Sequence, residues 1–150
     1  MVNKTVIDDF IQHKNWAIVG LSRSGKKFSN MAAKELQAQG YRVFPVNPHA
    51  TEIDGQQCYP NLQALAGMVD GALVMVPPKE AVGLVEAAAE AGITRIWLQQ
   101  GAESQEAIDL CARKNIALVH GECILMYAEP VKSFHRFHRW IWKLIGKLPQ

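Results

Sequence analysis

Short apolar runs alternate with helical patterns along most of this chain, and this rhythm limits the folds that it can adopt. The run at 16–20 ends at a glycine, and the runs at 41–48 and 70–78 end at prolines. Two further runs follow at 94–101 and 116–120, and amphipathic segments separate the runs. Helices between parallel strands form right-handed crossovers. The sequence therefore predicts an α/β, Rossmann-like, doubly wound fold with a five-stranded, mainly parallel sheet and flanking helices.

The length of the chain, 150 residues, is that of one domain. A helix is expected before the first strand, at about 5–13, and an extra basic amphipathic helix after the last strand. We expect one domain, 1–150, with an N-terminal helix in 1–14, a nucleotide-binding core in 15–127 and a C-terminal basic amphipathic helix in 128–150.

The basic residues are distributed unevenly. Residues 130–150 hold five of the sixteen basic residues and no acidic one, which leaves eleven basic and fourteen acidic residues in the rest. A mildly acidic body argues against a nucleic-acid partner. The basic, aromatic segment 130–148 allows contact with a membrane surface, although packing within the chain or across a dimer is the favoured expectation.

Three scattered cysteines argue against a disulfide framework, and neither a signal peptide nor an apolar run of membrane-spanning length is found. These features predict a cytoplasmic protein.

The loop after the first strand nearly matches two phosphate-binding patterns. Gly20, Gly25 and Lys26 fit the ATPase pattern G-x-x-x-x-G-K, but Lys27 stands where that pattern needs Ser or Thr. The two glycines also fit the outer positions of G-x-G-x-x-G, but Ser22 stands at the middle position. Because the loop leads from a strand into a helix, a phosphate is expected beside the first turn of that helix.

The neighbouring residues discriminate among nucleotides. ATP hydrolysis is disfavoured because Lys27 replaces the hydroxyl residue that binds Mg²⁺. NAD is disfavoured because the second strand ends in Asn47, Pro48 and His49, without the carboxylate that binds the ribose. A basic loop beside a neutral strand end tolerates an additional ribose phosphate. NADP and coenzyme A (CoA) both remain open at this point.

Four segments, VGLSRSGKKFSN, YRVFPVNP, MVPP and IWLQQG, resemble the small single-domain CoA-binding proteins. These proteins are similar in turn to the N-terminal domain of the succinyl-CoA synthetase alpha subunit. The resemblance covers about 15–123 and implies CoA or an acyl-CoA as the ligand. It implies three groups of contacts: the phosphates and the start of the pantetheine arm (Gly20, Leu21, Ser22, Arg23, Lys26, Lys27), the adenosine (Asn47, Pro48, His49), and the pantetheine with its thiol end (Pro77, Pro78, Gln99, Gln100, Gly101).

The chain departs from the family's ligases in several ways. Gln99 and Gln100 stand where the synthetase carries a carboxylate, and the phosphohistidine and ATP-grasp domains of the ligases are expected to be absent. No catalytic constellation and no metal-ligand set is found. We therefore expect a non-catalytic module that binds or senses CoA. The alternatives are an NADP-dependent oxidoreductase and a protein that acts on membranes or partners through its C-terminal helix.

Overall fold

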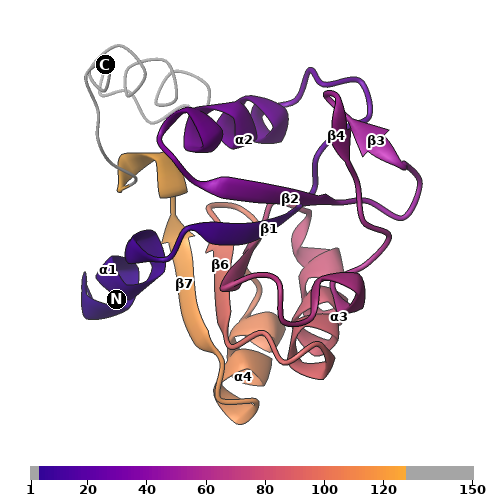
Figure 1. Ribbon diagram of the computed structural model, residues 1–150. Coiled ribbons are helices and arrows are strands. Elements are labelled where there is room, and N and C mark those ends of the chain that lie inside the picture. The colour runs from indigo at the N-terminus through magenta and orange to yellow at the C-terminus, as the bar shows by residue number, and fades with distance from the viewer. Residues whose placement is uncertain (1–3, 128–150) are drawn as a thin grey trace, which may run out of the picture.

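The structure is a computed structural model, which describes residues 4–127. Five parallel strands form its main sheet, in the order β2-β1-β5-β6-β7 (Figure 1). The strands are β1 (Asn15–Val19), β2 (Arg42–Val46), β5 (Gly71–Val74), β6 (Arg95–Gln99) and β7 (Ala117–Glu122). The predicted α/β fold class is confirmed. The predicted C-terminal helix at 128–150 lies outside the described residues.

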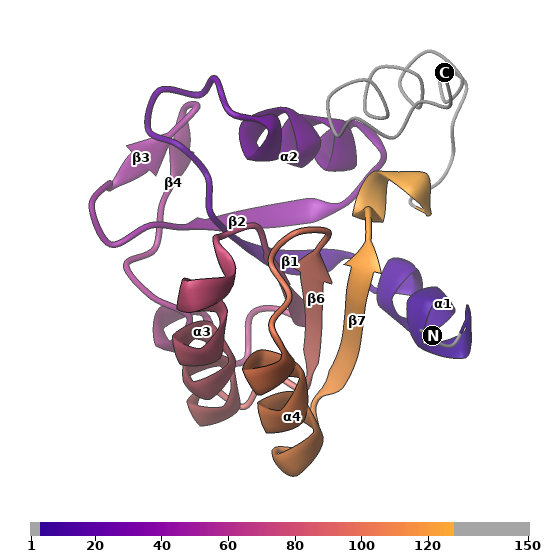
Figure 2. The ribbon, with the colours of Figure 1, turned by 180° about the vertical axis from the view of Figure 1, so that it is seen from behind.

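Helices cover both faces of the sheet. These helices are α1 (Lys4–Gln12), α2 (Phe28–Ala38), α3 (Pro78–Glu90) and α4 (Gln105–Arg113). Helices α3 and α4 lie together on one face, opposite α2, as the views from the two sides show (Figures 1 and 2). The α1 and α2 residues belong to one buried cluster, and the α3 and α4 residues belong to another.

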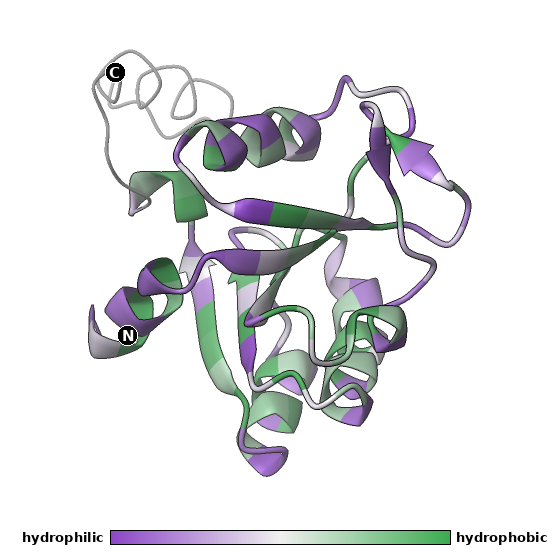
Figure 3. Ribbon diagram, in the orientation of Figure 1, coloured by the Kyte–Doolittle hydropathy of each residue, from purple (hydrophilic) through white to green (hydrophobic). Residues whose placement is uncertain are grey.

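Alternate residues of each strand enter the two clusters, since successive side chains point to opposite faces. In β1, Trp16 and Ile18 join the first cluster, whereas Ala17 and Val19 join the second. Because both faces are covered, the strands read as mainly apolar runs, and green, hydrophobic colouring is concentrated in their inner residues (Figure 3). This double coverage explains why the apolar runs predicted the strands well.

The third predicted strand is shorter than expected. It was predicted over 70–78, but β5 ends at Val74, and Pro78 is the first residue of α3. Proline is favoured at that helical position because the first residue of a helix needs no N–H donor.

A small hairpin, formed by β3 (Glu52–Ile53) and β4 (Gln56–Gln57), is not among the predicted elements. Asp54 and Gly55 form its two-residue turn, with φ angles of 51° and 78°. An Asp-Gly pair is the usual signal for a turn with two positive φ angles. Two 3₁₀ turns, η1 (Gln63–Leu65) and η2 (Ile124–Met126), were also missed.

The order of the strands determines where a ligand groove forms. From β1 the chain crosses through α2 to the edge strand β2, whereas β5 pairs with the other side of β1. The two crossovers therefore diverge between β1 and β5, and in such sheets ligands bind at the carboxyl ends of the strands near this point.

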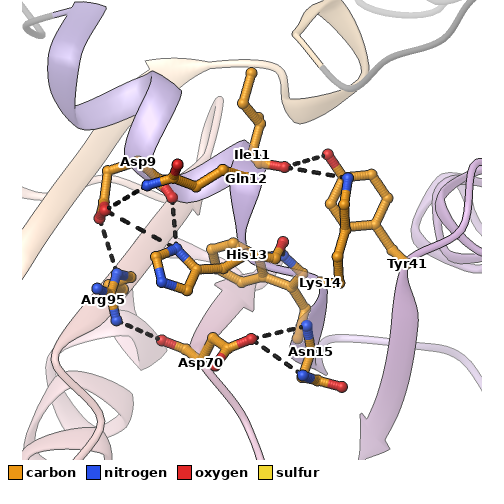
Figure 4. A network of polar contacts seen from close by, with 10 residues as sticks. Asp9, Ile11, Gln12, His13, Lys14, Asn15, Tyr41, Asp70 and Arg95 are labelled. Atoms are coloured by element: carbon orange, nitrogen blue, oxygen red, sulfur yellow. Dashed lines mark hydrogen bonds and ion pairs between the residues drawn. The ribbon is translucent and has the colours of Figure 1, made fainter.

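A polar network at the opposite end of the sheet fastens α1 (Figure 4). The Arg95 guanidinium donates to the Asp9 carboxylate at 2.8 Å and to the Asp70 carbonyl oxygen at 3.4 Å. Asn15 donates its backbone N–H and its side-chain amide to the Asp70 carboxylate, at 3.1 and 3.2 Å. The network joins α1 to β1, β6 and the residue that precedes β5.

The Asp9 contact predicts a loss of stability in acid. The hydrogen bond from Arg95 lowers the pKa of Asp9 from its ordinary value of 3.8. The contribution of this contact to stability is therefore complete above that value and disappears as pH falls through the lower folded-state pKa. Because both side chains are partly exposed, it contributes about 1 kcal/mol or less. Urea unfolding at pH values from 6 to 3 should show that the free energy of unfolding falls more steeply for the wild type than for Asp9→Asn. An equal dependence of this free energy on pH in the two proteins would contradict the prediction.

Candidate functional site

The loop after β1 begins with a glycine that no other residue can replace without strain. Gly20 has a φ of +112°, and a Cβ atom built on it would lie 2.1 Å from the Met75 carbonyl oxygen. The Met75 N–H in turn donates to the Val19 carbonyl oxygen at 2.9 Å, so the backbones that leave β1 and β5 remain in contact. Gly20 therefore allows the close approach of two strand ends at the floor of the groove.

Three buried or half-buried side chains hold the next part of the loop through consecutive carbonyl groups. The Ser29 hydroxyl donates to the Gly20 carbonyl oxygen at 2.9 Å. The Asn47 amide donates to the Leu21 carbonyl oxygen at 3.2 Å, and the Asn30 amide donates to the Ser22 carbonyl oxygen at 2.9 Å. The loop is thus tied both to the start of α2 and to the end of β2.

These bonds also determine the direction of the loop's N–H groups. In a trans peptide the carbonyl oxygen and the following N–H point in opposite directions. The Leu21 N–H therefore points away from Ser29, and the Arg23 N–H points away from Asn30. None of the described residues accepts a hydrogen bond from either group. Loop N–H groups without an acceptor in the protein suit an anion.

The first turn of α2 supplies further donors. Lys27 occupies the N-cap position and makes no side-chain capping bond, whereas Ser104 caps α4 by accepting from the Ala107 N–H. The uncapped first turn leaves N–H groups available to an external acceptor, and the helix dipole favours a negative charge there. The loop and the helix end together form a candidate phosphate site.

Two adjoining cavities lie at the carboxyl ends of the strands, with volumes of about 800 and 470 Å³. Gly20, Lys27, Met75, Val76 and Pro77 line both of them. The larger cavity extends toward the end of β2 and the first turns of α3, and the smaller one extends toward the end of β6. The loop therefore lies where the two cavities meet.

The structure brings ten of the fourteen predicted site residues to these walls. Besides the shared Gly20, Lys27 and Pro77, the larger cavity contains Leu21, Asn47, Pro48 and His49, and the smaller one contains Gln99, Gln100 and Gly101. The other four, Ser22, Arg23, Lys26 and Pro78, line neither cavity. Ser22 instead belongs to the bonded framework of the loop, since its hydroxyl accepts from the Ser24 N–H at 3.2 Å.

Gln99 is engaged by the protein itself. Its side-chain oxygen accepts from the Ile124 N–H, and its amide donates to the Cys123 sulfur, both at 3.1 Å. Burial raises the pKa of the Cys123 thiol, which favours its protonated form. The two hydrogen bonds of Gln99 therefore connect the end of β6 to the residues that follow β7, and they fix the position of Gln99 in the wall of the smaller cavity.

Several wall residues were missed by the sequence analysis. Lys79, Glu80 and Leu84 of α3 line the larger cavity, and Phe28 and Ser29 line the smaller one. The buried polar residues Ser29 and Asn30 had a signal in the sequence, since small polar residues at the start of a helix commonly bond to nearby backbone. The α3 residues had none, because only the crossover after β5 brings them beside the end of β2.

The described residues, 4–127, lack two other kinds of functional feature. No group of three His, Cys, Asp or Glu side chains there is arranged to hold a metal ion. No helix in that range is long and apolar enough to cross a membrane. A third cavity, of about 660 Å³, lies between α3 and α4 and includes Thr94 and Ile116, at the amino ends of β6 and β7.

Comparison with known proteins gives consistent similarities. The family model described as "CoA binding domain" matches residues 14–129. The uncharacterized protein YneT of Bacillus subtilis is 30% identical over 123 residues, covering 81% of this chain and 91% of YneT. A conserved hypothetical protein from Pyrococcus furiosus has a solved structure with a TM-score of 0.71 and 36% identity, covering 74% of this chain and 96% of that protein.

A larger relative shares only part of its length. The alpha subunit of the ADP-forming acetate–CoA ligase II of P. furiosus is 24% identical over 130 residues. The match covers 79% of this chain but only 28% of the ligase subunit.

Proposed function

The chain belongs to the family of CoA binding domains, and on this premise we propose that it binds coenzyme A or an acyl-CoA in the groove formed by the two adjoining cavities. The observation that carries the proposal is the loop at 20–27. Gly20 and Lys27 line both cavities, Leu21 lines the larger one, and the first turn of α2 beside them has no side-chain cap. If the pyrophosphate of CoA lay at the junction of the two cavities, the adenosine half of the ligand would occupy one cavity and the pantetheine half would occupy the other.

The walls suit the two halves differently. Asn47, His49 and Lys79 give the larger cavity polar groups that match an adenosine with its ribose phosphate. Phe28, Met75 and Ala102 make the smaller cavity mainly apolar, which matches the pantetheine arm. The adenosine is therefore assigned to the end of β2, and the thiol end is assigned to the end of β6.

We further propose that the protein binds or senses its ligand without turning it over. Among the described residues that line the two cavities, Glu80 is the one carboxylate and no cysteine is present. Ser29 is the one serine, and its hydroxyl donates to the Gly20 carbonyl oxygen instead of meeting a general base. This arrangement supports a binding role, because nucleophilic catalysis needs an activating base beside the nucleophile.

Thermal unfolding with a panel of nucleotides tests the proposal. CoA at about 100 times its Kd should stabilise the protein by about 2.7 kcal/mol, which raises Tm by about 5–11 °C. The increase should be smaller with 3′-dephospho-CoA at the same concentration, because that ligand lacks the ribose phosphate.

NAD and ATP serve as controls and should leave Tm nearly unchanged. An increase in Tm with NADP alone would replace the proposal with a reductase, and no increase with CoA would overturn it.

A further inference from the structure

Asn30 is the most completely enclosed polar residue at the loop. Its exposed fraction is 0%, and its side-chain amide makes three hydrogen bonds. The Oδ1 atom accepts from the Ser22 N–H at 3.0 Å, and Nδ2 donates to the Ser22 carbonyl oxygen at 2.9 Å. Nδ2 also donates to the Asp54 carboxylate at 3.3 Å. One side chain thus holds both backbone polar groups of a single loop residue.

The partners determine which way the Asn30 amide faces. A carboxylate and a carbonyl oxygen can only accept, so the atom that meets Asp54 and the Ser22 oxygen must be the nitrogen. The opposite atom must then be the oxygen, which meets the Ser22 N–H. With the amide reversed, both Ser22 contacts would bring like groups together. Asp54 therefore favours the orientation that holds Ser22.

Asp54 reaches Asn30 from outside the main sheet, at the tip of the β3–β4 hairpin. Its backbone has a positive φ of 51°, and its carboxylate also lies 3.9 Å from the Lys34 ammonium. A Cβ atom on Gly25 would lie 2.5 Å from the Asp54 carboxylate oxygen. The absence of a side chain at Gly25 thus leaves room for the carboxylate beside the loop.

We propose that Asn30 is a positioning residue for the phosphate-binding loop, and that Asp54 of the hairpin is the acceptor that orients it. Asn30 holds both backbone polar groups of Ser22, and this fixes the path of the loop between Leu21, which lines the larger cavity, and the start of α2. The hairpin thereby acts on the binding site without contacting the ligand. This inference rests on the proposed binding of CoA.

A matched pair of variants at Asp54 isolates this role. Asp54→Asn and Asp54→Gly remove the same negative charge and the same ion pair with Lys34, and both residues tolerate a positive φ. Asparagine keeps an acceptor oxygen for Asn30, whereas glycine does not. In calorimetric titration with CoA, Asp54→Asn should bind within about twofold of the wild type. Asp54→Gly should bind about five- to tenfold more weakly, the effect of one lost hydrogen bond.

Amide hydrogen exchange of Ser22 gives a measurement that does not depend on the ligand. The Ser22 N–H should exchange about five- to tenfold faster in Asp54→Gly than in Asp54→Asn, because the Asn30 oxygen holds it less firmly. Asn30→Ala should accelerate this exchange further and weaken CoA binding by about 10–100-fold.

Equal CoA affinity and equal Ser22 exchange in the two Asp54 variants would overturn the inference, even if Asn30→Ala failed to fold. If the wild type bound no CoA, the proposed function would fail. Ser22 exchange would then still decide whether the hairpin orders the loop.

Discussion

Replacing Gly20 with alanine is expected to abolish CoA binding and to lower the free energy of unfolding by about 2–6 kcal/mol. Two costs add together. A non-glycine residue at a positive φ costs about 1–3 kcal/mol, and forcing a methyl group against packed atoms costs about as much again. The methyl group would lie 2.1 Å from a backbone oxygen, that of Met75, which cannot move without separating the ends of β1 and β5. Urea unfolding and calorimetric titration with CoA measure the two effects.

Gly40→Ala is the matched control. Gly40 also has a positive φ, +97°, but no atom lies within 4 Å of the position that a Cβ would occupy. This variant should show the conformational cost alone, about 1–3 kcal/mol, and should bind CoA as the wild type does. If Gly20→Ala retained wild-type affinity, the loop after β1 would not be the binding site.

The second large effect is expected at Lys27. This residue lines both cavities, so its ammonium can reach a phosphate at their junction. Replacing Lys27 with glutamine should weaken CoA binding about tenfold or more at low ionic strength, because hydrogen bonds to charged groups contribute about 1.5–3 kcal/mol. The loss should shrink as salt is added, since salt screens exposed charges. Titrations with CoA at several salt concentrations measure both features.

Lys26→Gln provides the comparison. It removes the same charge one residue earlier, from a side chain that lines neither cavity, and should change the affinity about twofold or less. Equal losses in the two variants would mean that the loop attracts the ligand only through its overall charge. In Asn30→Ala the loss should persist at high salt, because a misplaced N–H group does not depend on a mobile charge.

The parallel sheet was predictable because its physical cause lies in local sequence. A strand that is buried on both faces needs a continuous apolar run, and a helix that covers a sheet needs an apolar side. The runs at 16–20 and 94–101 satisfied the first condition, and their strands were found within a few residues of the predicted ends. The β3–β4 hairpin was missed because its strands are two residues long and largely exposed, so only its Asp-Gly turn marked it.

The candidate site divides in the same way. Residues that directly follow a strand, such as Gly20, Asn47 and Gln100, were predictable, since the carboxyl ends of parallel strands lie at one edge of the sheet. The distances between side chains from different strands at that edge were not predictable from the sequence. Nothing in the sequence favoured Lys27 over Lys26 as a phosphate ligand. In the structure, Lys27 directly precedes α2, which begins at Phe28, and lines the cavities, whereas Lys26 does not.

By itself, therefore, the sequence determined the succession of the five main strands and their helices along the chain, and it singled out the loop that we propose binds a phosphate, because apolar periodicity and glycine positions express local backbone preferences. Only the tertiary structure decided how that loop is held. Asn30 and Asp54 are 24 positions apart, and Gly20 and Met75 meet through the pairing of β1 with β5. Contacts of this kind depend on how distant segments pack, and no local pattern encodes that packing.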